Sequence, residues 1–71
     1  MVLRQPVTSS NIHSIGYDPQ SHILEIEFHS GGVYQYFDVP QPVYNALMGA
    51  SSHGSFFHRN VRDKYRYTKI Q

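Results

Sequence analysis

The sequence predicts an α+β fold in which a small antiparallel three-stranded meander packs against one or two short helices. Apolar and polar side chains alternate along residues 22–29, a Gly-Gly pair follows that run, and an apolar stripe lies between a proline pair and a glycine. With 71 residues and no cysteine, stability must come from ordinary packing or self-association rather than from disulfides. We therefore expect residues 1–71 to form a single domain.

The middle strand of the meander, within residues 22–29, is the clearest element. The apolar side chains Leu24 and Ile26 alternate with Glu25 and Glu27, which is the period-two pattern of a half-buried sheet. The two carboxylates are therefore expected on a solvated outer face.

Turn residues connect the middle strand to its neighbours. An Asp-Pro-Gln-Ser turn at residues 18–21 separates it from a strand at residues 12–17. The Gly-Gly pair supplies the positive φ angles of a tight hairpin, so residues 33–39 should pair antiparallel with the middle strand. Residues 1–11 are expected to be an extended lead-in or edge segment.

Prolines end the sheet and introduce the helical part. Pro42 suits the first turn of a helix, because its missing N–H would have no partner there. A second break at residues 51–54 precedes another short helical turn at residues 55–61, and residues 65–70 are expected to be extended. The apolar stripe of the first helix is formed by Val43, Tyr44, Leu47 and Met48.

Basic residues are concentrated at the C-terminal end. Residues 59–71 hold five of the six basic side chains and one acidic one, whereas residues 1–58 hold one basic and four acidic ones. Cations neutralise phosphates and aromatic rings stack on bases, so this segment predicts an RNA-like partner. The candidate nucleic-acid-binding residues are Arg59, Arg62, Lys64, Arg66 and Lys69, with Tyr65 and Tyr67 stacking or supporting.

Tyr34 and Tyr36 are two residues apart and should lie side by side on one sheet face, with Gln35 and Phe37 opposite. The favoured interpretation is that they pack under the helix. The alternative is an aromatic platform on which bases stack. If the tyrosines are inside, Val33 and Phe37 point outward, which would favour a protein interface.

No constellation of residues predicts catalysis, a metal site or a cofactor. His53 and His58 are five residues apart, which is not the spacing that places two imidazoles on one helical face. Glu25 and Glu27 could mimic paired carboxylates, but a thin sheet offers no deep pocket to raise a pKa. A hydrolase built on them is the least favoured of the functional hypotheses, and we expect a non-enzymatic protein.

No apolar run approaches the roughly 20 residues of a membrane-spanning helix. The N-terminus also lacks the basic and apolar blocks of a signal peptide. We therefore expect a cytoplasmic protein without a membrane partner.

Several motifs resemble the KTSC domain, and the likeness covers nearly the whole chain. This family occurs alone in bacterial proteins or at the C-terminus of some lysyl-tRNA synthetases, which is why RNA binding has been suggested for it. The resemblance supports the fold and transfers no catalytic residue, and it has one departure, His58, where the family often has Asn. The matching residues are 9–12, 15–18, 27–36 with the Tyr-x-Tyr motif, Val39-Pro40, 54–57, Arg59, Val61, Arg62 and Tyr65.

Two functional hypotheses follow from these observations. The first is a small RNA-binding module that contacts transfer-RNA-like or single-stranded RNA through the basic C-terminal segment. The second is a protein interaction or self-association module that uses the open sheet face or an edge strand.

Overall fold

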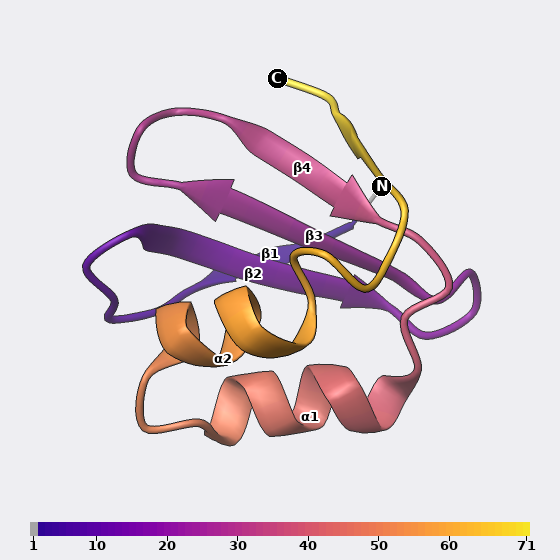
Figure 1. The fold of residues 1–71 in the computed structure, drawn as a ribbon. Coiled ribbons are helices and arrows are strands. Elements are labelled where there is room, and N and C mark those ends of the chain that lie inside the picture. The colour runs from indigo at the N-terminus through magenta and orange to yellow at the C-terminus, as the bar shows by residue number, and fades with distance from the viewer. Residues whose placement is uncertain (1) are drawn as a thin grey trace.

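The computed structural model describes residues 2–71 and contains one sheet and two helices (Figure 1). Helices α1 (Gln41–Gly49) and α2 (His53–Asn60) lie side by side against one face of the sheet. The predicted α+β class is confirmed. The sheet is antiparallel with its strands in chain order: β1 (Arg4–Pro6), β2 (Ile12–Asp18), β3 (Ile23–Phe28), β4 (Val33–Tyr36) and β5 (Tyr67–Lys69).

The prediction of three strands was wrong, because the structure has five. The additional strands β1 and β5 have three residues each, which is too short for an alternating pattern to be recognised. Their tertiary partners define them instead, since β1 pairs with β2 and β5 pairs with β4. The two extended segments expected at the ends of the chain are thus edge strands.

The first helix begins as predicted, and the second begins earlier. Helix α1 starts at Gln41 and has its proline in the first turn, as expected. Helix α2 starts at His53, inside the predicted break, because the Ser52 hydroxyl caps it by accepting a 3.2 Å hydrogen bond from the Ser55 backbone N–H. No helix within residues 2–71 is long and apolar enough to cross a membrane.

The helix-facing side of the sheet holds the hydrophobic core. Ile15, Leu24 and Ile26 of the sheet and Leu47 of α1 are fully buried there, and Phe57 of α2 packs with them. Burying an aliphatic side chain of this size contributes roughly 1.5–3 kcal/mol. This apolar contact attaches both helices to strands β2 and β3.

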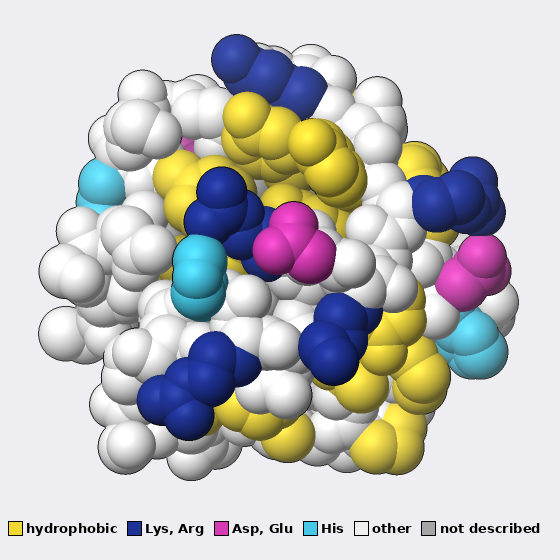
Figure 2. Space-filling view, in the orientation of Figure 1, with side chains coloured by type: hydrophobic (Ala, Val, Ile, Leu, Met, Phe, Trp, Pro, Cys, Tyr) yellow, Lys and Arg dark blue, Asp and Glu magenta, His cyan; other side chains and the backbone are white. Residues whose placement is uncertain are grey.

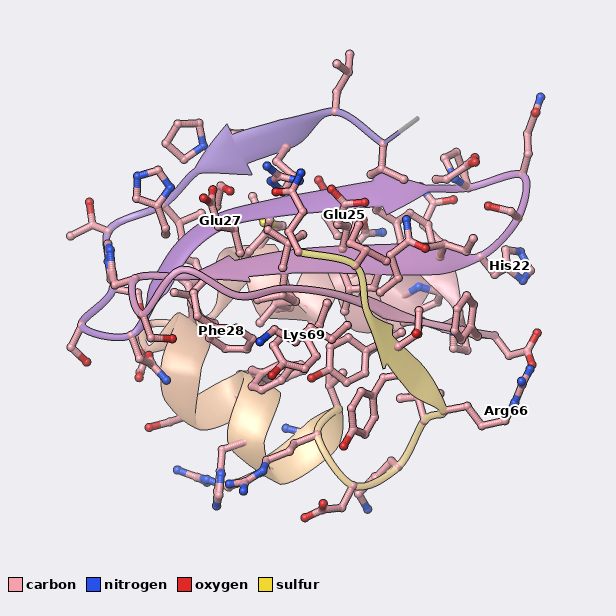
Figure 3. All side chains as sticks on the ribbon, turned by 90° about the horizontal axis from the view of Figure 1, so that it is seen from above. His22, Glu25, Glu27, Phe28, Arg66 and Lys69 are labelled. Atoms are coloured by element: carbon pink, nitrogen blue, oxygen red, sulfur yellow. The ribbon has the colours of Figure 1, made fainter. Side chains whose placement is uncertain are left out.

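The opposite face carries a buried ionic network. Glu25 is only 4% exposed, forms an ion pair with Arg4, and accepts a 2.9 Å hydrogen bond from the Gln35 side-chain amide. Its neighbour Glu27 accepts a 2.8 Å hydrogen bond from the Ser14 hydroxyl, and Figure 3 shows the two carboxylates side by side. The prediction of a solvated Glu25 was wrong, because Arg4 lies over the sheet and replaces water as its partner.

Glu27 is more exposed than Glu25 but is held in the same network. The Ser14 hydrogen bond lowers the pKa of Glu27, and His13 and Arg4 act in the same direction. Val33 also lies on this face, where the C-terminal residues cover it: its backbone N–H donates to the Gln71 carbonyl and its carbonyl accepts from Ile70. Val33 is therefore buried, although it points away from the helices.

Gly16 allows the N-terminal segment to cross β2 closely. A β-carbon at this position would overlap the Leu3 carbonyl oxygen and lie 2.8 Å from a Val2 methyl carbon. We expect Gly16→Ala to lower the free energy of unfolding by about 1–3 kcal/mol, measured by urea denaturation. Gly49→Ala is the matched control, because an added β-carbon there has no neighbour within 4 Å; equal stability of both variants would contradict this account.

Arg4→Met would leave Glu25 buried without its charge partner. We expect the free energy of unfolding to fall by on the order of 2 kcal/mol, and the double variant with Glu25→Met to recover most of it. Arg59→Met, on the exposed side of α2, should change stability little. Urea denaturation of the four proteins tests this, and a double variant no more stable than Arg4→Met would refute the network's role.

Candidate nucleic-acid interface

A groove of about 430 Å³ lies where strands β4 and β5 meet helix α2. We call it the aromatic groove. Its aromatic lining is formed by Phe28, Tyr34, Tyr36, Phe57 and Tyr67. Its polar lining is formed by Asn11, Ser30, His58, Arg62 and Asp63.

Strand register brings the aromatic side chains together. Tyr36 is the partner of Tyr67, and Tyr34 is the partner of Lys69, so all four side chains share the helix-facing side of the sheet. Phe57 of α2 reaches Tyr36 of β4, whereas Tyr67 of β5 stays 57% exposed. Figure 2 shows the result as an exposed hydrophobic patch with basic side chains around it.

The rings of the groove are in mutual contact. Tyr67 has its ring centroid 5.8 Å from that of Tyr34 and 5.5 Å from that of Tyr36, and Phe28 lies 5.6 Å from Tyr34. Such separations are typical of favourable tilted and edge-to-face aromatic pairs. Tyr67 is 57% exposed and Tyr36 is 4% exposed, so Tyr67 forms the rim of the groove and Tyr36 its floor.

The structure decides which sheet face carries Tyr34 and Tyr36. Tyr36 packs edge-to-face against Phe57 of α2, with centroids 5.3 Å apart, as the favoured interpretation predicted. Tyr34 is half-buried and also lines the aromatic groove. The Tyr-x-Tyr motif therefore contributes to both the core and the accessible surface.

Helix α2 orients the cation at the wall of the groove. The Arg62 guanidinium lies 3.0 Å from Nδ1 of His58 and can donate a hydrogen bond to it. Asp63 follows directly and lines the same wall. The groove thus has one cation and one anion at neighbouring positions.

The five predicted cations do not form one continuous patch. Arg62 lines the aromatic groove and Lys69 is in register with Tyr34, whereas Arg66 pairs with Asp38 at 3.1 Å at the far end of β5 (Figure 3). Arg59 borders two further hollows of about 410 and 170 Å³, the larger of which shares Asn11 and His58 with the aromatic groove, and Lys64 is exposed in the turn after α2. Of the predicted aromatic pair, Tyr67 lies in the groove and Tyr65 packs against the core.

Sequence reasoning did not place six residues of the groove at the site: Asn11, Phe28, Ser30, Phe57, His58 and Asp63. The Asn11 side chain approaches helix α2 closely, since a β-carbon on Gly54 would lie 3.1 Å from the Asn11 Cγ atom. Both residues of this contact fall in the motifs that resemble the KTSC family, which was the available signal. Asp63 was counted only as an interruption of the basic segment. Within residues 2–71, no group of three or more His, Cys, Asp or Glu side chains could hold a metal ion.

Comparison with known proteins explains why these motifs occur together. A family model described as the KTSC domain matches residues 8–65. The chain belongs to the KTSC domain family. This KTSC domain superposes on the crystal structure of a KTSC domain protein from Yersinia pestis with a TM-score of 0.97 and 45% identity, covering all of both chains.

Relatives of this KTSC domain occur alone and within a larger enzyme. An uncharacterized protein of Stutzerimonas stutzeri is 44% identical over 68 residues, covering 94% of this chain and 96% of its own length. A lysine–tRNA ligase of Nostoc sp. is 36% identical over 61 residues. That match covers 86% of this chain and 11% of the ligase, so the similarity concerns one segment of the enzyme.

Burial raises the pKa of Tyr36 to about 12, and the neighbouring Tyr67 and Tyr34 contribute in the same direction. The neutral phenol is therefore favoured by the fold. The raised pKa of Tyr36 stabilises the folded state fully at pH values below the ordinary tyrosine pKa of about 10. This stabilisation is lost as the pH rises through the folded-state pKa of about 12.

We expect an ultraviolet titration of the KTSC domain to show a tyrosine that ionises near pH 12. Tyr36→Phe should remove this late step, and Tyr34→Phe is the matched control that should retain it. Ionisation of every tyrosine near pH 10 in the folded protein would contradict the burial of Tyr36.

Proposed function

We propose that this KTSC domain is an RNA-binding module that takes unpaired bases into the aromatic groove. The proposal is supported chiefly by one observation: the exposed ring of Tyr67 lies beside Tyr34 in a groove that Arg62 lines, and Lys69 is in register with Tyr34 on the same sheet face. Stacking of a base on such a ring contributes roughly 1–3 kcal/mol, and neighbouring cations neutralise the phosphates.

The shape of the groove favours single-stranded segments over duplexes. Sequence-specific RNA recognition commonly uses loops, bulges and ends, whose bases can leave the stack and lie on aromatic side chains. A tilted arrangement of rings, with Tyr67 at the rim and Tyr36 at the floor, suits one base at a time. The match to a segment of lysine–tRNA ligases agrees with this proposal, because transfer RNA has such unpaired bases.

The placement of the cations changes the expected strength of binding. For a single strand, each phosphate contact contributes about −0.7 to the slope of log affinity against log salt concentration. Five cooperating cations would give a slope of about −3.5, whereas the two beside the groove give about −1.4. We therefore expect a weak accessory contact with modest salt dependence.

Fluorescence anisotropy with labelled single-stranded oligonucleotides at rising salt tests RNA binding. Tyr67→Ala should weaken binding about tenfold through lost stacking, and Arg62→Gln should reduce the salt slope by about 0.7. Lys64→Gln is the matched control, because Lys64 is exposed but does not line the groove. No binding at low salt, or equal losses in all three variants, would overturn the proposal.

A second candidate is association with a protein through the sheet face opposite the helices. Arg4 and Glu25 occupy the middle of that face, which makes it a poor apolar surface. The exposed side chains Leu3 and Ile70 nevertheless border a shallow hollow of about 640 Å³ beside the network. Light scattering over a range of concentrations, with Leu3→Ser for comparison, would detect self-association by this surface.

A further inference from the structure

Asp63 is the single acidic side chain among the described residues that line the aromatic groove. Asp63 is exposed, and within residues 2–71 it makes no ion pair and no side-chain hydrogen bond, while the adjacent Arg62 contacts His58. A carboxylate here opposes the binding of phosphate, since like charges repel. In a groove that Arg62 also lines, this carboxylate can accept hydrogen bonds from a part of the ligand that donates them.

The chemistry of a carboxylate limits which bases of an RNA could donate hydrogen bonds to Asp63. An ionised Asp accepts hydrogen bonds through two oxygens and donates none. On guanine, the N1–H and N2–H groups are adjacent donors that match both oxygens. Adenine presents an acceptor at N1, uracil has a single N3–H between two carbonyls, and cytosine has an acceptor beside its amino group, so each of these matches less well.

We propose that Asp63 makes the aromatic groove selective for an unpaired guanine. The guanine ring stacks on Tyr67, its N1–H and N2–H donate to the two Asp63 oxygens, and Arg62 and Lys69 meet the flanking phosphates. This inference rests on the proposed function, because it specifies which base the groove takes.

The geometry of the groove agrees with this assignment. Tyr67 is in register with Tyr36, and both line the groove together with Asp63. Asp63 and Arg62 are both exposed where they line the groove, and their charges act in opposite directions on the pKa of Tyr36. A base stacked on the exposed Tyr67 ring would therefore share the groove with the Asp63 carboxylate.

Oligouridines carrying one central guanine, inosine or adenine provide the test, with binding followed by anisotropy at low salt. Inosine lacks the N2 amino group and so loses one of the two donors. We expect guanine to bind about tenfold more tightly than adenine and inosine to be intermediate. In Asp63→Ala, removal of a negative charge should strengthen binding generally, while the ratio between guanine and adenine should fall to about one.

Asp38→Ala is the matched control, because it removes an exposed carboxylate that pairs with Arg66 outside the groove. It should leave the ratio between guanine and adenine unchanged. Equal affinity for the three bases, or a preference for guanine that survives in Asp63→Ala, would overturn the guanine assignment alone. Failure of every oligonucleotide to bind would overturn both this inference and the proposed RNA-binding function.

Discussion

Strand β5 pairs antiparallel with β4, and its register determines what the helix-facing surface presents. The pairing places Tyr67 beside Tyr36 and Lys69 beside Tyr34, and it is extended by hydrogen bonds from Phe37 to Arg66 and from Ile70 to Val33. Because side chains alternate between faces, a slip by one residue would move these groups to the other side of the sheet. The aromatic groove depends on this three-residue strand.

The two faces of the sheet are stabilised by different interactions. One face packs apolar side chains under α1 and α2, whereas the other buries Glu25 against Arg4 and Gln35. A buried ion pair adds little net stability compared with apolar packing, but it strongly disfavours arrangements in which one charge lacks its partner. In a chain of this size, the network links β1, β3 and β4 and so helps to define the strand order.

A strand or helix could be predicted from the sequence only where its pattern of apolar residues was long enough. The alternation around Leu24 and Ile26 and the apolar stripe of α1 were long enough to indicate a strand and a helix. The three residues of β1 and of β5 could be recognised only as extended. The start of α2 was displaced because the capping role of Ser52 was not recognised among the residues of the expected break.

For the candidate site, the sequence alone determined the residue types: a basic C-terminal segment, a Tyr-x-Tyr pair on one face, and the motifs of the KTSC family. Only the tertiary structure decided which of these residues meet. It brought Arg62 and Tyr67 to the groove, left Arg66 with Asp38, and buried Glu25 under Arg4. The physical reason is that strand pairing joins residues distant in sequence, and a charge becomes a surface group or a buried partner according to what lies across from it.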